Sequence, residues 1–248
     1  LMGRRVVGEI NSPCGSCAIC QSGRRAHCPD RTALGIRGRD GVLAEHFLLP
    51  EKNFHFVPED MPDEVAVFTE PLAAACEVLV QVHVRPSDQV LVLGDGKLGL
   101  LVAQVLALTG CELTVVGRHQ KKLAILASRG VQTMLQDEAG SACADIVVEC
   151  TGEPAGFDTA QRLVRPRGTV VLKSTYHGRT QSDLTSIVVD EVTVVGSRCG
   201  PFAAALRLLE MGLVDVEPLV TAEYELGDAL EAFEHAGRRD ALKVLVRP

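Results

Sequence analysis

Four cysteines lie within 15 residues of this 248-residue chain, with the spacing C-x2-C-x2-C-x7-C: Cys14, Cys17, Cys20 and Cys28. Thiolates at such short spacings can turn back onto a single ion, and Gly15 and Gly23 permit the tight backbone that this requires. The pattern predicts a structural zinc held by four sulfurs. Such an ion has no open position, so it would stabilise a loop and leave the chemistry to other residues.

Two other interpretations of the cysteines are a disulfide pair and a chance spacing, and His27 could replace one sulfur ligand. The five remaining cysteines are single residues in apolar segments, as expected of reduced core thiols: Cys76, Cys111, Cys143, Cys150 and Cys199. No segment resembles a signal peptide, and no apolar run is long enough to cross a membrane. We therefore expect a reducing, cytoplasmic compartment.

A second motif could bind phosphate. The apolar strand predicted at 90–93 runs into Gly94-Asp95-Gly96-Lys97-Leu98-Gly99, and an apolar helix is predicted over 100–108. In G-x-G-x-x-G the first glycine permits a sharp turn, the second lets a pyrophosphate approach the backbone, and the third packs the helix on the sheet. The phosphates would lie at the helix N-terminus. The alternative is a glycine-rich turn without a ligand, and Asp95 is expected to point away from the phosphates.

The next predicted strand ends in Val115-Val116-Gly117-Arg118-His119, without the acid that usually binds the adenosine ribose. A glycine leaves room for a 2′-phosphate and an arginine can pair with it, so we expect NADP(H). The alternative is NAD(H), with Arg118 stacked on the adenine or facing solvent. The predicted coenzyme-binding residues come from the glycine motif, this strand end and one later turn: Gly94, Gly96, Lys97, Leu98, Gly99, Gly117, Arg118, His119 and Thr151.

Strands and helices alternate from residue 89 onward, which predicts a parallel, doubly wound α/β sheet. Residues 1–60 are expected to be irregular β structure with strands at 4–10 and 41–50, followed by a helix capped by Asp60. Later strands are expected at 113–116, 131–134, 146–150, 169–172, 192–195 and 242–246. Later helices are expected at 69–82, 121–128, 154–164, 203–211 and 226–236.

Composition narrows the partners. The net charge is −7, aromatic residues make up 4% of the chain and tryptophan is absent. An acidic chain with few aromatic rings is a poor match for nucleic acid or an anionic membrane surface. We therefore expect a small-molecule substrate.

The cysteine loop followed by the glycine motif resembles the zinc-containing medium-chain dehydrogenases, the alcohol and polyol dehydrogenase family. Four further segments fit that pattern: DGVLAE (40–45), TEPL (69–72), ECTG (149–152) and LKV (242–244). The resemblance implies a partial GroES-like β-rich domain at 1–66, a Rossmann domain at 67–202 and a return to the first domain at 203–248. It also implies hydride transfer between NAD(P)(H) and an alcohol, aldehyde or ketone, in a homodimer or homotetramer.

Relatives bind a catalytic zinc with a Cys and a His-Glu pair that precede the segment matching residue 1. Among the family's catalytic ligands only Glu70, in TEPL, has a matching position here; read alone, it is a first-turn helix carboxylate. We expect a fragment of a longer enzyme or a naturally short product. The competing hypothesis is a non-catalytic module, or redox sensor, that binds a dinucleotide and one zinc.

Overall fold

The protein is described by a computed structural model that covers residues 2–141, 144–176 and 182–248. The chain divides into two compact units, Leu1–Glu70 with Phe202–Pro248, and Pro71–Pro201. The first unit therefore consists of both ends of the chain, and the second is one continuous segment. The domain limits expected from the sequence, 1–66, 67–202 and 203–248, remain predictions.

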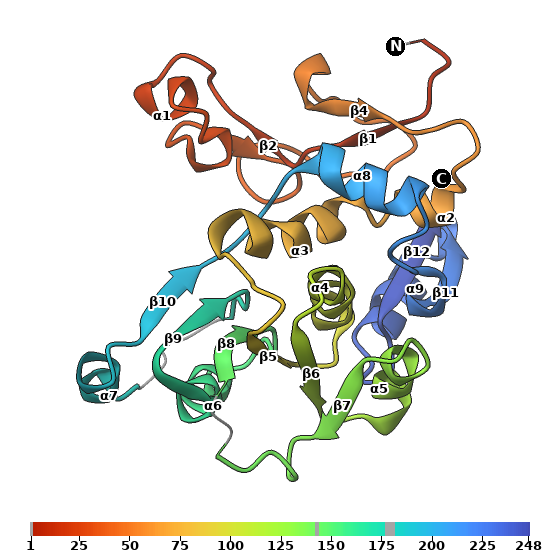
Figure 1. The fold of residues 1–248 in the computed structure, drawn as a ribbon. Helices are drawn as coiled ribbons and strands as arrows, with labels where there is room; N and C mark the ends of the chain where they lie inside the picture. The colour runs from red at the N-terminus through yellow and green to blue at the C-terminus, as the bar shows by residue number, and fades with distance from the viewer. Residues whose placement is uncertain (1, 142–143, 177–181) are drawn as a thin grey trace. The chain divides into compact units, whose positions relative to one another are not determined.

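The second unit contains a six-stranded parallel sheet in the order β10-β9-β8-β5-β6-β7 (Figure 1). Its strands are β5 (Gln89–Leu93), β6 (Glu112–Gly117), β7 (Gln132–Leu135), β8 (Ala144–Glu149), β9 (Val164–Leu172) and β10 (Thr193–Gly196). After β5 the chain adds β6 and then β7 on one side of it. After β8 it adds β9 and then β10 on the other side. The switch point between β5 and β8 is where ligands bind in sheets of this kind. The predicted fold class is confirmed.

Helices connect and cover these strands: α3 (Thr69–Gln81), α4 (Lys97–Ala107), α5 (Gln120–Ala127), α6 (Ala155–Leu163) and α7 (Leu184–Val189). Helix α4 contacts β5 and β6, and its Leu100 and Leu101 are fully buried. Helix α6 packs Phe157 and Leu163 into an apolar cluster with Val147 of β8. Burial of these side chains stabilises the sheet and the helices packed on it.

One connection in this sheet is unusual. Residues 136–143 join β7 to β8, and the described residues of this connection form no helix. Parallel strands are ordinarily joined by a crossover of a dozen or more residues. An open hollow of about 960 Å³ lies beside the starts of β5, β6 and β7, near this short connection.

The first unit has three small two-stranded sheets. Strand β1 (Val6–Gly8) pairs with β4 (Phe54–Phe56), β2 (Asn11–Ser12) with β3 (Thr32–Ala33), and β11 (Val220–Glu225) with β12 (Lys243–Arg247). Its helices are α1 (Ala18–Gln21), α2 (Asp63–Ala66), α8 (Phe202–Glu210) and α9 (Ala229–Ala236). Four 3-10 turns complete it: η1 (Arg25–His27), η2 (Glu51–Asn53), η3 (Glu217–Leu219) and η4 (Leu226–Asp228).

Several expected elements differ from the structure. The strand expected at 41–50 is irregular chain, and residues 41–48 are all exposed. A strand needs a partner for its backbone hydrogen bonds. Here β1 and β4 pair with each other rather than with residues 41–50. Asp60 caps no helix: α2 begins at Asp63 after Pro62. The strand expected at 4–10 is shorter, and β11 and α7 were not foreseen.

The cysteines outside the loop are free thiols where the structure describes them. Cys76 is buried, as expected of a core residue. Cys111, Cys150 and Cys199 are only partly buried, so the expectation of core positions was wrong for them. Cys143 lies outside the described residues. In the described part of the chain no helix combines the length and apolar character that crossing a membrane requires.

Candidate functional site

The four cysteines of the loop converge on one point. Their sulfurs all lie within 4.8 Å of one another. Four of the separations are 3.5 Å (Cys17–Cys20), 3.6 Å (Cys14–Cys28), 3.9 Å (Cys14–Cys20) and 3.9 Å (Cys17–Cys28). A tetrahedron with Zn–S bonds of about 2.3 Å has edges of about 3.8 Å. The sulfurs therefore already have the arrangement of a four-thiolate zinc site.

The surroundings of the sulfurs differ across the cluster. Hydrogen bonds from the backbone of Ser16 and Cys17 lower the pKa of the Cys14 thiol to about 6. Burial and the neighbouring thiols raise the pKa of Cys20 to about 12. A bound divalent cation offsets that cost, because it stabilises all four thiolates together. The loop is also tied to the rest of its unit, where Lys52 Nζ donates to the Pro13 carbonyl at 3.2 Å.

The glycine motif forms the turn between β5 and α4. Gly94 has φ +115°, and a Cβ there would come within 2.7 Å of the Cys150 carbonyl oxygen. At Gly99 a Cβ would collide with the Gly94 carbonyl. At Gly96 a Cβ would meet nothing within 4 Å. Gly94 and Gly99 therefore permit close backbone packing, while Gly96 faces open space.

This turn opens into a cleft of about 170 Å³ at the carboxyl ends of the central strands. Its walls are Leu93–Gly96, Val116–His119, Gln136, Cys150, Thr151, Glu153, Ala155, Gly156 and Thr159. The N-cap residue of α4 is Gly96, which has no side chain to cap the helix. A helix N-terminus beside a glycine turn suits a diphosphate, because its backbone amides point toward the ligand and the helix dipole favours negative charge. The chain's own residues thus fit a dinucleotide.

The sequence-predicted binding residues are partly brought together here. Six line the cleft: Gly94, Gly96, Gly117, Arg118, His119 and Thr151. Lys97, Leu98 and Gly99 form the first turn of α4 and do not line it. Backbone amides of that turn can still reach a phosphate at the helix end.

Asp95 does point away from the helix N-terminus, toward the end of β6. Its Oδ2 accepts hydrogen bonds from the backbone amides of Arg118 at 2.7 Å and His119 at 2.5 Å. Burial alone would raise the pKa of Asp95, but the hydrogen bonds from His119 and Arg118 outweigh it and lower the pKa. The carboxylate also fills the space beside Gly117, where a Cβ would lie 2.6 Å from it. The space directly beside the α-carbon of Gly117 is therefore occupied by this carboxylate.

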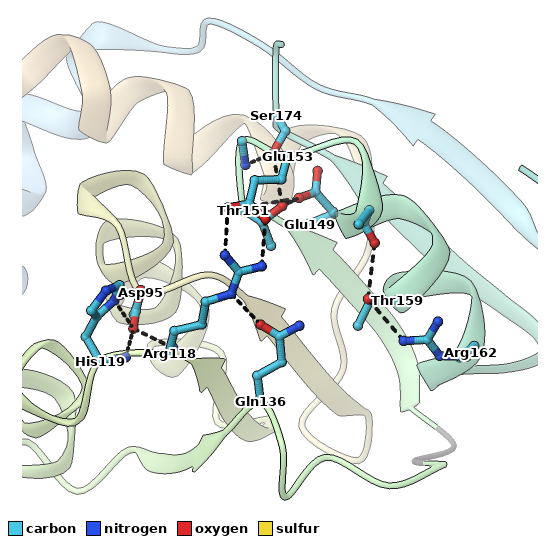
Figure 2. Close-up of polar contacts among 12 residues, drawn as sticks. Asp95, Arg118, His119, Gln136, Glu149, Thr151, Glu153, Thr159, Arg162 and Ser174 are labelled. Atoms are coloured by element: carbon cyan, nitrogen blue, oxygen red, sulfur yellow. Dashed lines mark hydrogen bonds and ion pairs between the residues drawn. The ribbon is translucent and has the colours of Figure 1, made fainter. Parts of the chain in front are cut away.

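Arg118 is held by two residues that sequence reasoning missed (Figure 2). Its Nη1 and Nη2 donate to Glu153 Oε1 and Oε2, each at 2.6 Å, and its Nε donates to Gln136 Oε1 at 2.7 Å. The bond to Glu153 raises the pKa of the Arg118 guanidinium. Glu153 directly follows the ECTG segment, and its place after a strand end was the only signal in the sequence.

The turn that carries Glu153 is fixed by a buried acid. Glu149 Oε1 accepts hydrogen bonds from the backbone amide of Thr151 at 2.7 Å and from its hydroxyl at 2.6 Å. Thr151 Oγ1 in turn accepts from the Glu153 amide at 3.2 Å. Gly156 leaves the room that this acid needs, since a Cβ there would collide with Glu149 and Thr151. Thr151 therefore shapes the wall of the cleft.

Glu70 is the second residue of α3 and is partly buried. Among the described residues, only the four loop cysteines form a cluster of three or more potential metal ligands. Glu70 belongs to no such cluster, so its role as a ligand of a catalytic zinc remains a prediction.

Comparison with known proteins gives the same picture. The family model "Alcohol dehydrogenase GroES-like domain" matches residues 1–59, and "Zinc-binding dehydrogenase" matches residues 98–211. Sorbitol dehydrogenase of Halalkalibacterium halodurans is 28% identical over 265 aligned positions, which cover 100% of this chain and 77% of the relative.

Two solved structures share the fold. A zinc-binding dehydrogenase of Sinorhizobium meliloti 1021, bound to NADP, superposes with TM-score 0.90 at 27% identity, over 99% of this chain and 77% of the other. An Escherichia coli CFT073 protein described as a short chain alcohol dehydrogenase, with NADH, superposes with TM-score 0.90 at 23% identity, again over 99% and 77%. The second likeness shows the fold alone.

Fold, cysteine cluster and matches together define a dinucleotide-dependent oxidoreductase of the alcohol and polyol dehydrogenase type. The chain belongs to the zinc-containing medium-chain dehydrogenase family. The predicted family, zinc and NAD(P) are confirmed at the level of the family.

Proposed function

We propose that this chain binds NAD(P)(H) in the cleft at the carboxyl ends of β5, β6 and β8, for hydride transfer with a polyol or its carbonyl counterpart. The observation that carries the proposal is the glycine turn of 94–99 beside a helix N-terminus whose N-cap residue is Gly96. The sorbitol dehydrogenase relative supports a polyol as the alcohol.

Different residues of the cleft bind different parts of the coenzyme. The amides of Lys97, Leu98 and Gly99 face the diphosphate, with Gly96 leaving room for its approach. Gly117, Arg118 and His119 lie beside the adenosine ribose, and Thr151 shapes the opposite wall. When bound, the nicotinamide accepts or supplies the hydride.

The two metal roles differ. The loop of Cys14, Cys17, Cys20 and Cys28 would hold a structural zinc, which stabilises the first unit. Glu70 would contribute a carboxylate to a catalytic zinc, whose chemistry is to polarise the substrate oxygen. One carboxylate does not hold such an ion alone, so this role needs ligands beyond those that the described residues bring together.

Two measurements on the full chain test the proposal. Calorimetry should detect binding of NADH or NADPH, and oxidation of either should be followed at 340 nm with ketoses and simple aldehydes. Turnover with a ketose supports a polyol dehydrogenase. Failure to bind either dinucleotide contradicts the proposal for this chain.

A second candidate is a module that binds the dinucleotide without catalysis, as a subunit or redox sensor. It is favoured by the single cluster of metal ligands among the described residues. Metal analysis separates the two candidates: about one zinc per chain with dinucleotide binding and no turnover supports the module, and about two zinc ions with turnover support the enzyme.

We further propose a cytoplasmic homodimer or homotetramer. The support for an oligomer is the position of β10 at the edge of the parallel sheet, because an edge strand can pair with a strand of another chain. Light scattering coupled to size-exclusion chromatography tests the assembly. A mass equal to one chain at micromolar concentration contradicts it.

A further inference from the structure

We propose that Glu153 sets coenzyme choice by holding Arg118, so that the cleft favours an adenosine ribose with a free 2′-hydroxyl over one with a 2′-phosphate. The inference rests on the proposed function, because it concerns the same cleft. It assigns Arg118 a role opposite to the one expected from the sequence, namely a guanidinium already neutralised by a neighbouring carboxylate.

The first argument is geometric. Arg118 forms a bidentate pair with Glu153, with both N···O distances 2.6 Å, and a third bond to Gln136. A guanidinium has five N–H donors, so three are engaged. The planar fork that would clasp a phosphate is the part bound to the Glu153 carboxylate. A 2′-phosphate would have to displace that carboxylate to be recognised.

The second argument is the local charge. The Arg118 backbone amide donates to Asp95, whose carboxylate also lies against the α-carbon of Gly117. The Glu153 carboxylate therefore offsets the guanidinium charge directly, and Asp95 adds a weaker electrostatic interaction with it. A guanidinium that is already neutralised offers a 2′-phosphate little net attraction, whereas a ribose hydroxyl can donate a hydrogen bond to a carboxylate.

The third argument is that Glu153 is positioned by its own turn. Its amide donates to Thr151 Oγ1, and the Gly152 amide donates to Ser174 Oγ at 2.8 Å. The backbone that carries the Glu153 side chain is thus fixed by bonds that do not involve the pair. The Arg118 and Glu153 side chains are 48% and 47% exposed, so the pair is open to a ligand and its loss does not empty a core.

Calorimetry with the adenosine half of the coenzyme tests the proposal without catalysis. The ligands are ADP-ribose and 2′-phospho-ADP-ribose, and the variant is Glu153→Gln in the full chain. Releasing Arg118 should tighten binding of the 2′-phosphorylated ligand about tenfold, or about 1.4 kcal/mol. ADP-ribose should change by less than about twofold. The matched control is Glu191→Gln, which removes the acid from the exposed Arg167–Glu191 pair of the same unit and should change neither affinity.

A second variant distinguishes two effects of Glu153: holding the Arg118 side chain, and repelling the 2′-phosphate directly. In an Arg118→Ala background, Glu153→Gln should improve binding of the 2′-phosphorylated ligand by less than about twofold. A gain that persists there, or an unchanged preference in Glu153→Gln alone, overturns the inference while leaving the proposed function intact. Failure of the unaltered chain to bind ADP-ribose or NADH overturns both.

Discussion

The carboxylate of Asp95 lies against the α-carbon of Gly117, so that a methyl group there would come within 2.6 Å of Oδ2. One residue comes from the glycine turn after β5 and the other ends β6. The contact explains how an acid can be part of a phosphate-binding motif. The Asp95 carboxylate accepts hydrogen bonds from the protein's own backbone amides. It also ties the glycine turn to the end of β6.

Gly117→Ala should destabilise the second unit, because Asp95 is buried and cannot swing away without losing its bonds to two amides. Overpacking of this kind costs about 1–3 kcal/mol. Thermal unfolding should show a lower Tm, and NADH should bind more weakly. The matched control is Gly196→Ala at the end of β10, where a Cβ meets nothing within 4 Å. Equal effects at the two strand ends would contradict the packing argument.

Asp95→Asn should make stability less dependent on acid pH. The pKa of Asp95 is lowered in the folded chain, so its carboxylate contributes stability above its ordinary value near 4, and that contribution is lost as pH falls through the lowered pKa. The variant should lose about 1–2 kcal/mol at pH 7. Urea unfolding at pH 7 and near pH 3 checks this. A deficit that is equal at both pH values would count against it.

Cys17→Ser should release the zinc of the cysteine loop and lower the unfolding temperature of the first unit. Structural zinc contributes on the order of 10 kcal/mol of binding free energy in small zinc domains, and a hydroxyl is a poor substitute for a thiolate. Elemental analysis should show that the zinc content of the variant is lower by about one ion per chain. Cys111→Ser, outside the loop, should keep the metal. An unchanged zinc content in Cys17→Ser would refute the four-cysteine assignment.

Lys173→Met should weaken the packing of α3 on the sheet. The buried ammonium of Lys173 donates to the Ala74 carbonyl at 2.6 Å and to Ser197 Oγ at 3.0 Å. Loss of the donor leaves one part-buried and one buried acceptor without this partner, which costs about 1–3 kcal/mol. Urea unfolding measures the loss, with Lys121→Met at an exposed position of α5 as the control. No difference between the two variants would show that these bonds contribute nothing.

The doubly wound sheet could be predicted from the sequence because its signals are local. Apolar runs such as 90–93 and glycines at helix ends mark the six strands and the helices α3 to α6 within a few residues. The segment 41–50 has an equally apolar pattern, but a strand also needs a partner, and that is not a local property. Its side chains are exposed over 41–48.

The cleft could be predicted only in part, for a similar reason. The glycine motif and the cysteine loop are contiguous in sequence, and each indicates its chemistry by spacing alone. The pair between Arg118 and Glu153 joins residues 35 positions apart, and Asp95 meets Arg118 across 23. Such contacts depend on the order of strands in the sheet. The arginine was therefore read as a phosphate ligand without its carboxylate partner.

The central claim is that the turn at 94–99 receives the diphosphate of a redox coenzyme. Gly96→Asp tests it most directly, because a Cβ at Gly96 meets nothing within 4 Å and the substitution should leave the fold intact. Calorimetry with NADH should show binding to the unaltered chain and a loss of about 100-fold or more in the variant, at equal thermal stability. Equal affinity in the two proteins would contradict the account.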